Sequence, residues 1–112
     1  MPDIISNLLF GFTRQLKSIL GKNLSKVIVY GSYARGDYRE NSDVDVMVLV
    51  KLSESEIKKI LPEIYDMAYD IELENNIHIS VVMKNEVQIN QQITAYHLFY
   101  HDHGPADRYY HS

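Results

Sequence analysis

The stretch VYGSYARGDYRENSDVDV, residues 29–46, decides the fold that the sequence predicts. It starts at the end of the short apolar run KVIVY (26–30) and ends inside a second run, VDVMVLVK (44–51). Both runs are rich in β-branched residues, so each predicts a strand. The twelve residues 31–42 between them are polar and punctuated by glycine, with room for one helical turn at 33–35. A connection of that length in a small domain is usually functional or disordered.

Upstream and downstream of this stretch the pattern is helical. Residues 3–20 have apolar side chains at helical spacing, which predicts an amphipathic helix. Ser53 and Glu56 have the spacing of a capping box, which opens a second helix. Pro62 falls inside that helix and should kink it or split it in two.

The C-terminal third predicts one more strand and one more helix. Residues 77–83 form the strand, residues 86–100 the helix, and the tail from about residue 104 is expected to be only partly ordered. The predicted order is therefore α-β-β-α-β-α. This order is typical of an α/β (α+β) domain with a small mixed sheet that carries its helices on one face.

Composition narrows the class of protein. With 112 residues, the chain predicts a single domain, 1–112, with one core. A net charge of −4 makes it a poor candidate for wrapping nucleic acid, so no direct nucleic-acid partner is expected. Cysteine is absent, which excludes disulfides, thiolate metal sites and a thiol nucleophile. The sequence has neither a signal-peptide pattern nor a membrane-length apolar run, so we expect a cytoplasmic protein with no membrane partner.

Two pairs of residues in the deciding stretch indicate a phosphate and metal site. Gly31 lets the backbone approach a ligand closely, the helix start offers free N–H groups, and Ser32 adds a hydroxyl donor. Asp43 and Asp45 lie two residues apart on a strand, so both point to the same face, opposite Val44. Such carboxylates repel each other, and Mg²⁺ bound between them removes the repulsion. The alternatives are an ordinary turn for the first pair and solvated acids for the second.

The series Gly31-Ser32, ten further residues and then Asp43-Val44-Asp45 resembles the signature of the nucleotidyltransferase superfamily of DNA polymerase β. The run GSYARGDYRENSDVDVMV is similar to the minimal nucleotidyltransferases (MNT), the small stand-alone members of that superfamily. Many of these resemble the antitoxin half of paired HEPN/MNT modules. The element order and the length are compatible with that family over nearly the whole chain. The resemblance therefore implies a nucleotidyltransferase-like fold.

The resemblance also implies a reaction, the metal-assisted transfer of a nucleotidyl group. Gly31 and Ser32 would contact the β and γ phosphates of a nucleoside triphosphate, with ATP as the first choice, and Arg35 would lie near the phosphates. Asp43 and Asp45 would be the catalytic residues and would hold one or two Mg²⁺ ions. In antitoxin-like members the acceptor is a tyrosine of a HEPN toxin partner, which is adenylylated and so inactivated.

One departure from the family pattern leaves alternatives open. The superfamily usually takes a third carboxylate from a later strand, and here the expected position falls on Ser80 or, as second choice, on His78. Glu72 and Glu74, just before that strand, are candidate substitutes. The chain is then an active transferase, or a catalytically weak or inactive antitoxin that works by binding its partner. A third alternative is a small-molecule, antibiotic-type transferase, for which a homodimer would have to supply the acceptor site.

Two other features have competing structural explanations. Arg35 fits an ion pair with Asp37, or with another acid of its loop, as well as it fits a phosphate contact. His97 and His101 have the i,i+4 spacing of zinc ligands on a helix, and His103 follows. An aromatic C-terminal helix that packs on the core explains these histidines better, so no zinc site is predicted.

Overall fold

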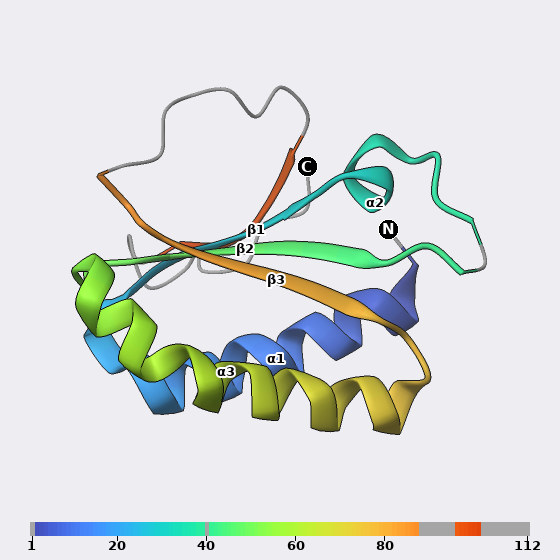
Figure 1. The fold of residues 1–112 in the computed structure, drawn as a ribbon. Coiled ribbons are helices and arrows are strands. Elements are labelled where there is room, and N and C mark those ends of the chain that lie inside the picture. The colour runs from blue at the N-terminus through green and yellow to red at the C-terminus, as the bar shows by residue number, and fades with distance from the viewer. Residues whose placement is uncertain (1, 40, 88–95, 102–112) are drawn as a thin grey trace.

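A four-stranded mixed sheet with two long helices on one face is the frame of the structure (Figure 1). The computed structural model describes residues 2–39, 41–87 and 96–101. In chain order, the elements are α1 (Asp3–Leu20), a 3-10 turn (Gly21–Asn23), β1 (Leu24–Tyr30), α2 (Ser32–Arg35), β2 (Val44–Val50), α3 (Glu54–Asn75), β3 (Ile79–Asn85) and β4 (Tyr96–His101).

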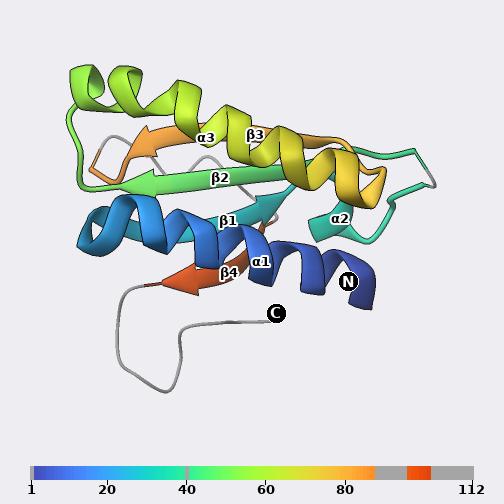
Figure 2. The same cartoon turned by 90° about the horizontal axis from the view of Figure 1, so that it is seen from below.

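The sheet has the strand order β3-β2-β1-β4. β1 is antiparallel to both of its neighbours, whereas β2 and β3 are parallel. A parallel pair needs a long crossover connection, which α3 supplies. α1 and α3 lie side by side on the same face of the sheet (Figure 2), and α2 lies on the opposite side, at the end of β1 (Figure 1). The expected mixed sheet with its helices on one face is confirmed for the two long helices.

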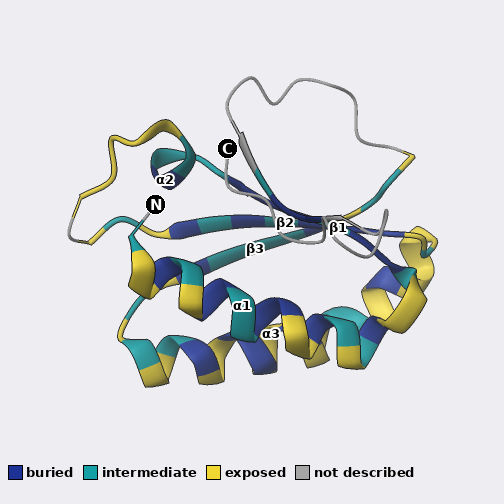
Figure 3. Ribbon diagram, turned by 180° about the vertical axis from the view of Figure 1, so that it is seen from behind, coloured by how far each residue is buried: buried dark blue, intermediate teal, exposed yellow. Residues whose placement is uncertain are grey.

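The core lies between the sheet and the two long helices. Val44, Val46 and Val48 alternate along β2 and are fully buried, as are Phe12 of α1 and Ile64 of α3. Figure 3 shows the exposed residues gathered on the outer sides of the helices. The predicted alternation of β2 is therefore confirmed, and it places Asp45 on the other face of that strand, together with Met47 and Leu49. Among the described residues, no helix has the length and apolar character needed to cross a membrane.

α3 begins at the capping box that the sequence predicts. The Ser53 hydroxyl accepts a hydrogen bond from the backbone N–H of Glu56 at 3.3 Å, and the Glu56 carboxylate accepts one from the Ser53 N–H at 3.0 Å. This is a complete capping box. The hydrogen bonds to Ser53 lower the pKa of Glu56. The helix predicted at 3–20 and the helical turn in the loop after β1 are confirmed as well.

Pro62 does not split α3 in two, so the predicted split is wrong, whereas the predicted kink stays a prediction. The helix runs unbroken from Glu54 to Asn75 with the proline inside it. Pro62 lies on the exposed side of the helix, while Ile57 before it and Ile64 after it are buried. Apolar contacts on both sides of the proline therefore outweigh the backbone hydrogen bond that it cannot make.

The helix predicted at 86–100 is also wrong where the structure describes it, because residues 96–101 form β4 beside β1. The predicted order α-β-β-α-β-α is thus incorrect in its last element. Phe99 and Tyr100 are adjacent yet both buried, and the register with β1 shifts at this point. A β-bulge allows two successive side chains to share one face, which hides the strand's two-residue period in the sequence. Residues 88–95 and the tail from about residue 104 lie outside the described residues.

The change in β4 also removes the helical spacing of the C-terminal histidines. His97 and His101 are positions of a strand, and His103 lies outside the described residues. The zinc spacing and the aromatic helix that was preferred to it both assumed a helix here, which is wrong. Phe99 carries the packing that was expected of that helix, since its ring lies 5.0 Å from the ring of Phe10 on α1.

Replacing Pro62 with alanine should stabilise the protein. The substitution restores one backbone donor inside α3 and removes the ring that crowds the preceding turn, so we expect a gain of about 1–3 kcal/mol in the free energy of unfolding. Urea denaturation of both proteins measures it. The neighbouring Glu63→Ala substitution, also at an exposed position, should change stability by less than about 0.5 kcal/mol. A loss of stability in Pro62→Ala would contradict this account of α3.

Candidate functional site

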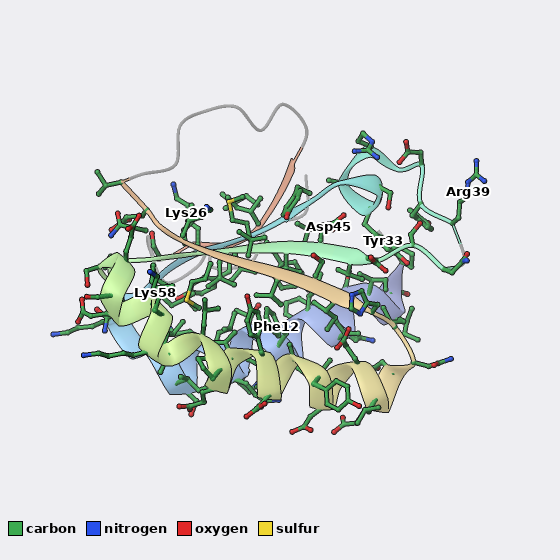
Figure 4. All side chains as sticks on the ribbon, viewed as in Figure 1. Phe12, Lys26, Tyr33, Arg39, Asp45 and Lys58 are labelled. Atoms are coloured by element: carbon green, nitrogen blue, oxygen red, sulfur yellow. The ribbon has the colours of Figure 1, made fainter. Side chains whose placement is uncertain are left out.

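The candidate site lies where β1 ends and β2 begins. These two strands are antiparallel and joined by residues 31–43, so the loop that follows β1 returns to the start of β2. In the register, Tyr30 pairs with Asp45. Figure 4 shows Asp45 and Tyr33 at this end of the sheet, with Arg39 farther out on the loop. The predicted glycine–serine turn and the predicted acidic pair are thus neighbours in space.

The backbone of Gly31 lies in close contact with the carboxylate of Asp45. Gly31 has a φ of +71°, a conformation that favours glycine, and a Cβ added to it would overlap the Oδ2 atom of Asp45 and lie 3.1 Å from its Cγ. Only glycine therefore fits at this point of the turn. The sequence predicts that the backbone at Gly31 can come close to another group. In the structure, that group is the carboxylate of Asp45.

α2 holds the loop in a defined shape. The backbone N–H of Arg35 donates to the carbonyl of Gly31 at 3.0 Å, and Gly36, with a φ of +86°, ends the turn. The ring of Tyr33 is buried and stacks on that of Tyr38, with centroids 4.7 Å apart. Burial raises the pKa of Tyr33, and Tyr38 adds to the effect. The aromatic stack ties the outer part of the loop back to α2.

A second turn leads from the loop into the acids. The Ser42 side chain accepts a hydrogen bond from the backbone N–H of Arg39 at 2.7 Å, and the Ser42 N–H donates to the Arg39 carbonyl at 3.0 Å. The Val44 N–H then donates to the carbonyl of His78 at 2.9 Å, where β2 joins β3. Asp43 is thereby held between two backbone-bonded residues.

The two aspartates are electrostatically unfavourable as they stand. Asp43 is exposed and Asp45 is partly buried. Burial raises the pKa of Asp45, and the nearby negative charge of Asp43 raises it further. Arg35 and His78 act in the opposite direction with smaller effects. Burial and the charge of Asp45 also raise the pKa of Tyr30. A cation between the carboxylates would relieve this cost.

The donor set at this site suits Mg²⁺ that arrives with a phosphate. Within residues 2–39, 41–87 and 96–101, no group of three or more His, Asp or Glu side chains is arranged to hold a metal ion. The acids therefore offer two carboxylates and no more. Mg²⁺ is commonly held by one or two carboxylates and completed by substrate phosphates and water. The site thus fits a nucleotide-bound Mg²⁺ and does not fit a structural metal.

The position next to Asp45 on β3 is occupied by Ser80. The parallel register of β2 and β3 pairs these two residues, which places Ser80 where the superfamily pattern expects a third acid. Of the two candidate substitutes, Glu72 reaches this edge of the site and Glu74 does not. The Glu72 carboxylate accepts a hydrogen bond from the backbone N–H of Ile79 at 2.7 Å and contacts Nδ1 of His78. Glu74 lines a separate pocket beside α1.

Arg35 makes the ion pair that the alternative interpretation predicts. Its Nε lies 3.3 Å from Asp37 Oδ2, and both side chains are more than half exposed. An exposed pair of this kind contributes about 0–1 kcal/mol and is easily broken. Arg35 nevertheless lies near enough for its charge to act on Asp45. Its phosphate contact stays a prediction.

Sequence reasoning missed one feature, a pocket of about 550 Å³ beside the acids. It lies between the C-terminal end of α3, the loop before Asp43 and the start of β3, and its walls include Ser42, Tyr69, Glu72 and His78. The pairing of Glu72 with His78 joins a helix to a strand through a turn. No spacing rule predicts such a contact. The αL conformation of Asn76, at the end of α3, closes that turn, and an asparagine pair at 75–76 was its only signal in the sequence.

Comparisons with known proteins show the family of this chain. The family model described as "Nucleotidyltransferase domain" matches residues 12–100. "Putative protein adenylyltransferase MJ0141" of Methanocaldococcus jannaschii is 45% identical over 64 residues, which cover 54% of this chain and 65% of that protein. The chain therefore spans just under two thirds of that relative.

Two solved structures share the fold. One is a toxin–antitoxin complex crystallised with AMP-PNP, with a TM-score of 0.58 and 20% identity, covering 87% of this chain and 73% of that chain. The other is a mutant of the toxin–antitoxin MntA–HpeT, with a TM-score of 0.57 and 17% identity over the same shares of the two chains. At these identities the likeness establishes the fold alone.

Gly31→Ala should destabilise the protein by about 1–3 kcal/mol, because the new methyl group is strained by the backbone conformation and collides with the Asp45 carboxylate. The matched control is Gly11→Ala on α1, where an added Cβ meets nothing within 4 Å. That change should stabilise the helix by about 0.5–1 kcal/mol. Chemical denaturation of the two variants measures the difference, and equal stabilities would refute the contact at Gly31.

Asp45→Asn should make the folded protein more stable at neutral pH. The raised pKa of Asp45 means that the folded protein binds this proton more tightly than the unfolded chain does. The group's stabilising contribution is thus present below its ordinary pKa of 3.8 and is lost as the pH rises through the raised value. The gain in Asp45→Asn should therefore be larger at pH 7 than at pH 4, in metal-free buffer.

Urea midpoints at the two pH values test this expectation. Asp66→Asn, which removes an exposed carboxylate on α3, controls for the loss of one negative charge. An Asp45→Asn variant that is less stable than the wild type at pH 7 would show that the carboxylate is compensated within the chain.

Proposed function

We infer that this chain, which belongs to the nucleotidyltransferase domain family, transfers a nucleotidyl group from MgATP to a hydroxyl acceptor. The observation that carries the inference is the contact of the Gly31 backbone with the Asp45 carboxylate, beside the second carboxylate of Asp43. A glycine turn beside two mutually repelling acids is suited to a phosphate chain and its cation together.

The proposed roles follow from this placement. Gly31 and Ser32 contact the β and γ phosphates, and Asp43 and Asp45 hold one or two Mg²⁺ ions. When bound, Mg²⁺ supplies neutralisation of the charge on the phosphates. Arg35 leaves its exposed partner and turns its guanidinium toward the phosphates, where it offsets charge that develops during transfer.

The reaction is an in-line displacement at the α-phosphorus. The acceptor oxygen forms a bond to that phosphorus, and the bond to the oxygen that bridges the α and β phosphates breaks. Pyrophosphate leaves with the electron pair of the broken bond, and the acceptor hydroxyl gives up its proton. The chain's contribution is to position the reacting groups and to stabilise their charge.

The acceptor that we propose is a tyrosine of a HEPN-type toxin, so that the chain acts as an antitoxin by protein adenylylation. Two features support this choice. The fold is shared with toxin–antitoxin structures, one of them crystallised with AMP-PNP, and the M. jannaschii relative is named as a protein adenylyltransferase. Tyrosine adenylylation would consume ATP and leave AMP on the partner.

The second candidate is an antitoxin that binds its partner without modifying it. Ser80 at the register position of Asp45 favours this function, since a hydroxyl cannot replace a carboxylate as a proton acceptor at neutral pH. Such a protein would keep its nucleotide site and neutralise the toxin by covering a surface.

Asp43→Asn and Asp45→Asn should each lower transfer at least about 100-fold while leaving the fold intact, because each removes a carboxylate on which charge neutralisation depends. The assay is incorporation of label from α-labelled ATP, with Mg²⁺, into proteins of the source-cell lysate. Asp66→Asn is the control and should transfer normally.

A labelled band that depends on both aspartates identifies the acceptor by its mass. Full labelling by the double Asn variant would refute the site. A wild-type protein that labels nothing, yet inhibits the toxin as well as the double variant does, would establish the binding-only antitoxin.

A further inference from the structure

We propose that the pocket between the end of α3 and the start of β3 is the acceptor site, and that His78, held by Glu72, takes the proton of the acceptor hydroxyl there. This inference rests on the proposed transferase function and deepens it. The pocket has a volume of about 550 Å³ and adjoins the loop that leads into Asp43. Ser42, the residue directly before Asp43, is part of its wall, so a second substrate in the pocket would lie beside the acids.

Glu72 is fixed by two donors. Its Oε2 accepts a hydrogen bond from the backbone N–H of Ile79 at 2.7 Å and pairs with Nδ1 of His78. The carboxylate is 17% exposed, whereas the imidazole is 64% exposed. In the tautomer that places the Nδ1 proton toward Glu72, the free lone pair of the imidazole lies on Nε2. A partly buried carboxylate thus orients an accessible base.

His78 lies at the end of the sheet that carries the acids. The backbone carbonyl of His78 accepts a hydrogen bond from Val44, and the parallel register pairs Val44 with Ile79 and Asp45 with Ser80. Asp43 and His78 each come directly before the first residue of their strand, so their backbones are neighbours where β2 and β3 begin. The protonated form of His78 is also near enough to lower the pKa of Asp45.

The apolar wall of the pocket suits an aromatic acceptor. Tyr69 and Leu73 lie one helical turn apart on α3, and their side chains are 58% and 64% exposed. Ile77 continues this wall toward His78. Large apolar side chains left uncovered next to a polar group are typical of a binding surface. A phenol ring laid on this wall would direct its hydroxyl to the imidazole.

The chemical step balances as follows. Nε2 of His78 takes the proton as the phenol oxygen bonds to the α-phosphorus of ATP, and pyrophosphate leaves with the electrons of the broken P–O bond. The imidazolium, stabilised by Glu72, then releases the proton to water. Ser80 has no group that can accept a proton at neutral pH, so the histidine performs the role usually given to the third carboxylate. His78 is the catalytic residue and Glu72 a positioning residue.

The first experiment uses the full chain, MgATP and the labelled acceptor. His78→Ala should lower kcat about 100- to 10,000-fold and leave the affinity for MgATP unchanged. Because the imidazole is exposed, added free imidazole should restore part of the rate in His78→Ala and none in Asp45→Asn. A purely structural role of His78 would not give this rescue. Unchanged kcat in His78→Ala, in a wild type that transfers, would overturn the proposal and leave the transferase function intact.

Glu72 has a matched control on the same helix turn. Glu72→Gln should lower kcat about 10- to 100-fold. Glu74→Gln removes a carboxylate two residues away that faces the α1 side, and it should transfer normally. Equal rates in the two variants would contradict the positioning role.

A second measurement needs neither nucleotide nor acceptor. Nitrogen NMR of the free protein reports which nitrogen of His78 is protonated, and the His78→Ala spectrum assigns its signals among the five histidines. We expect Nδ1–H in the wild type and a shift toward Nε2–H in Glu72→Gln. A wild-type imidazole with Nε2–H would overturn the proposal. The expected tautomer in a protein that transfers nothing would instead show that the proposed function fails, and with it the acceptor role, although the Glu72–His78 pair exists.

Discussion

The contact between the Gly31 backbone and the Asp45 carboxylate is the constraint on which the rest of the site depends. It requires β1 and β2 to be antiparallel in a fixed register, with Tyr30 opposite Asp45. The register is secured from the other face of β2, where Val44 and Val46 are fully buried under the helices. A slip of one residue would bury the acids and expose the valines. The hydrophobic core thereby fixes the position of the Gly31–Asp45 contact, although no core side chain takes part in it.

This arrangement costs stability at the site. Asp45 is partly buried beside another carboxylate. Among the described residues, Arg35 and the protonated form of His78 lower its pKa, but they do not cancel the effects of burial and Asp43. Other parts of the structure must supply the stability that offsets this cost. α3 contributes through its complete capping box at Ser53 and through apolar contacts that keep the helix continuous at Pro62. A site kept in an unfavourable state by a stable frame is prepared to bind a cation, because binding removes a penalty that already exists.

The sequence predicted what depends on local pattern and missed what depends on distant contacts. The helix at 3–20, the strand alternation of β2 and the closeness of Gly31 to the acids all follow from periodicity, glycine and spacing. The split predicted at Pro62 was wrong because tertiary burial outweighed a local rule. β4 was mistaken for a helix because a bulge at Phe99 breaks the two-residue period, and only its pairing with β1 reveals it. The sequence named Glu72 and His78 separately but did not predict their contact, since the turn after α3, closed by Asn76, brings the two side chains together.

The same electrostatics explains why an imidazole is a reasonable substitute for a third carboxylate at this site. Asp43 already raises the pKa of Asp45, and a further acid at Ser80 would add a second repulsion next to a partly buried charge. Placing the acid at Glu72 instead keeps it off the β2–β3 register, where the Ile79 N–H and His78 hold it. His78 then brings proton-accepting capacity to the acids without another negative charge. The proposed roles are also separate in space. The β1–β2 turn would hold phosphate and cation, and the α3–β3 turn would supply the base and an apolar wall for the acceptor. An in-line displacement requires the acceptor oxygen to attack the α-phosphorus from the side opposite the leaving pyrophosphate, so the acceptor needs a place of its own beside the nucleotide.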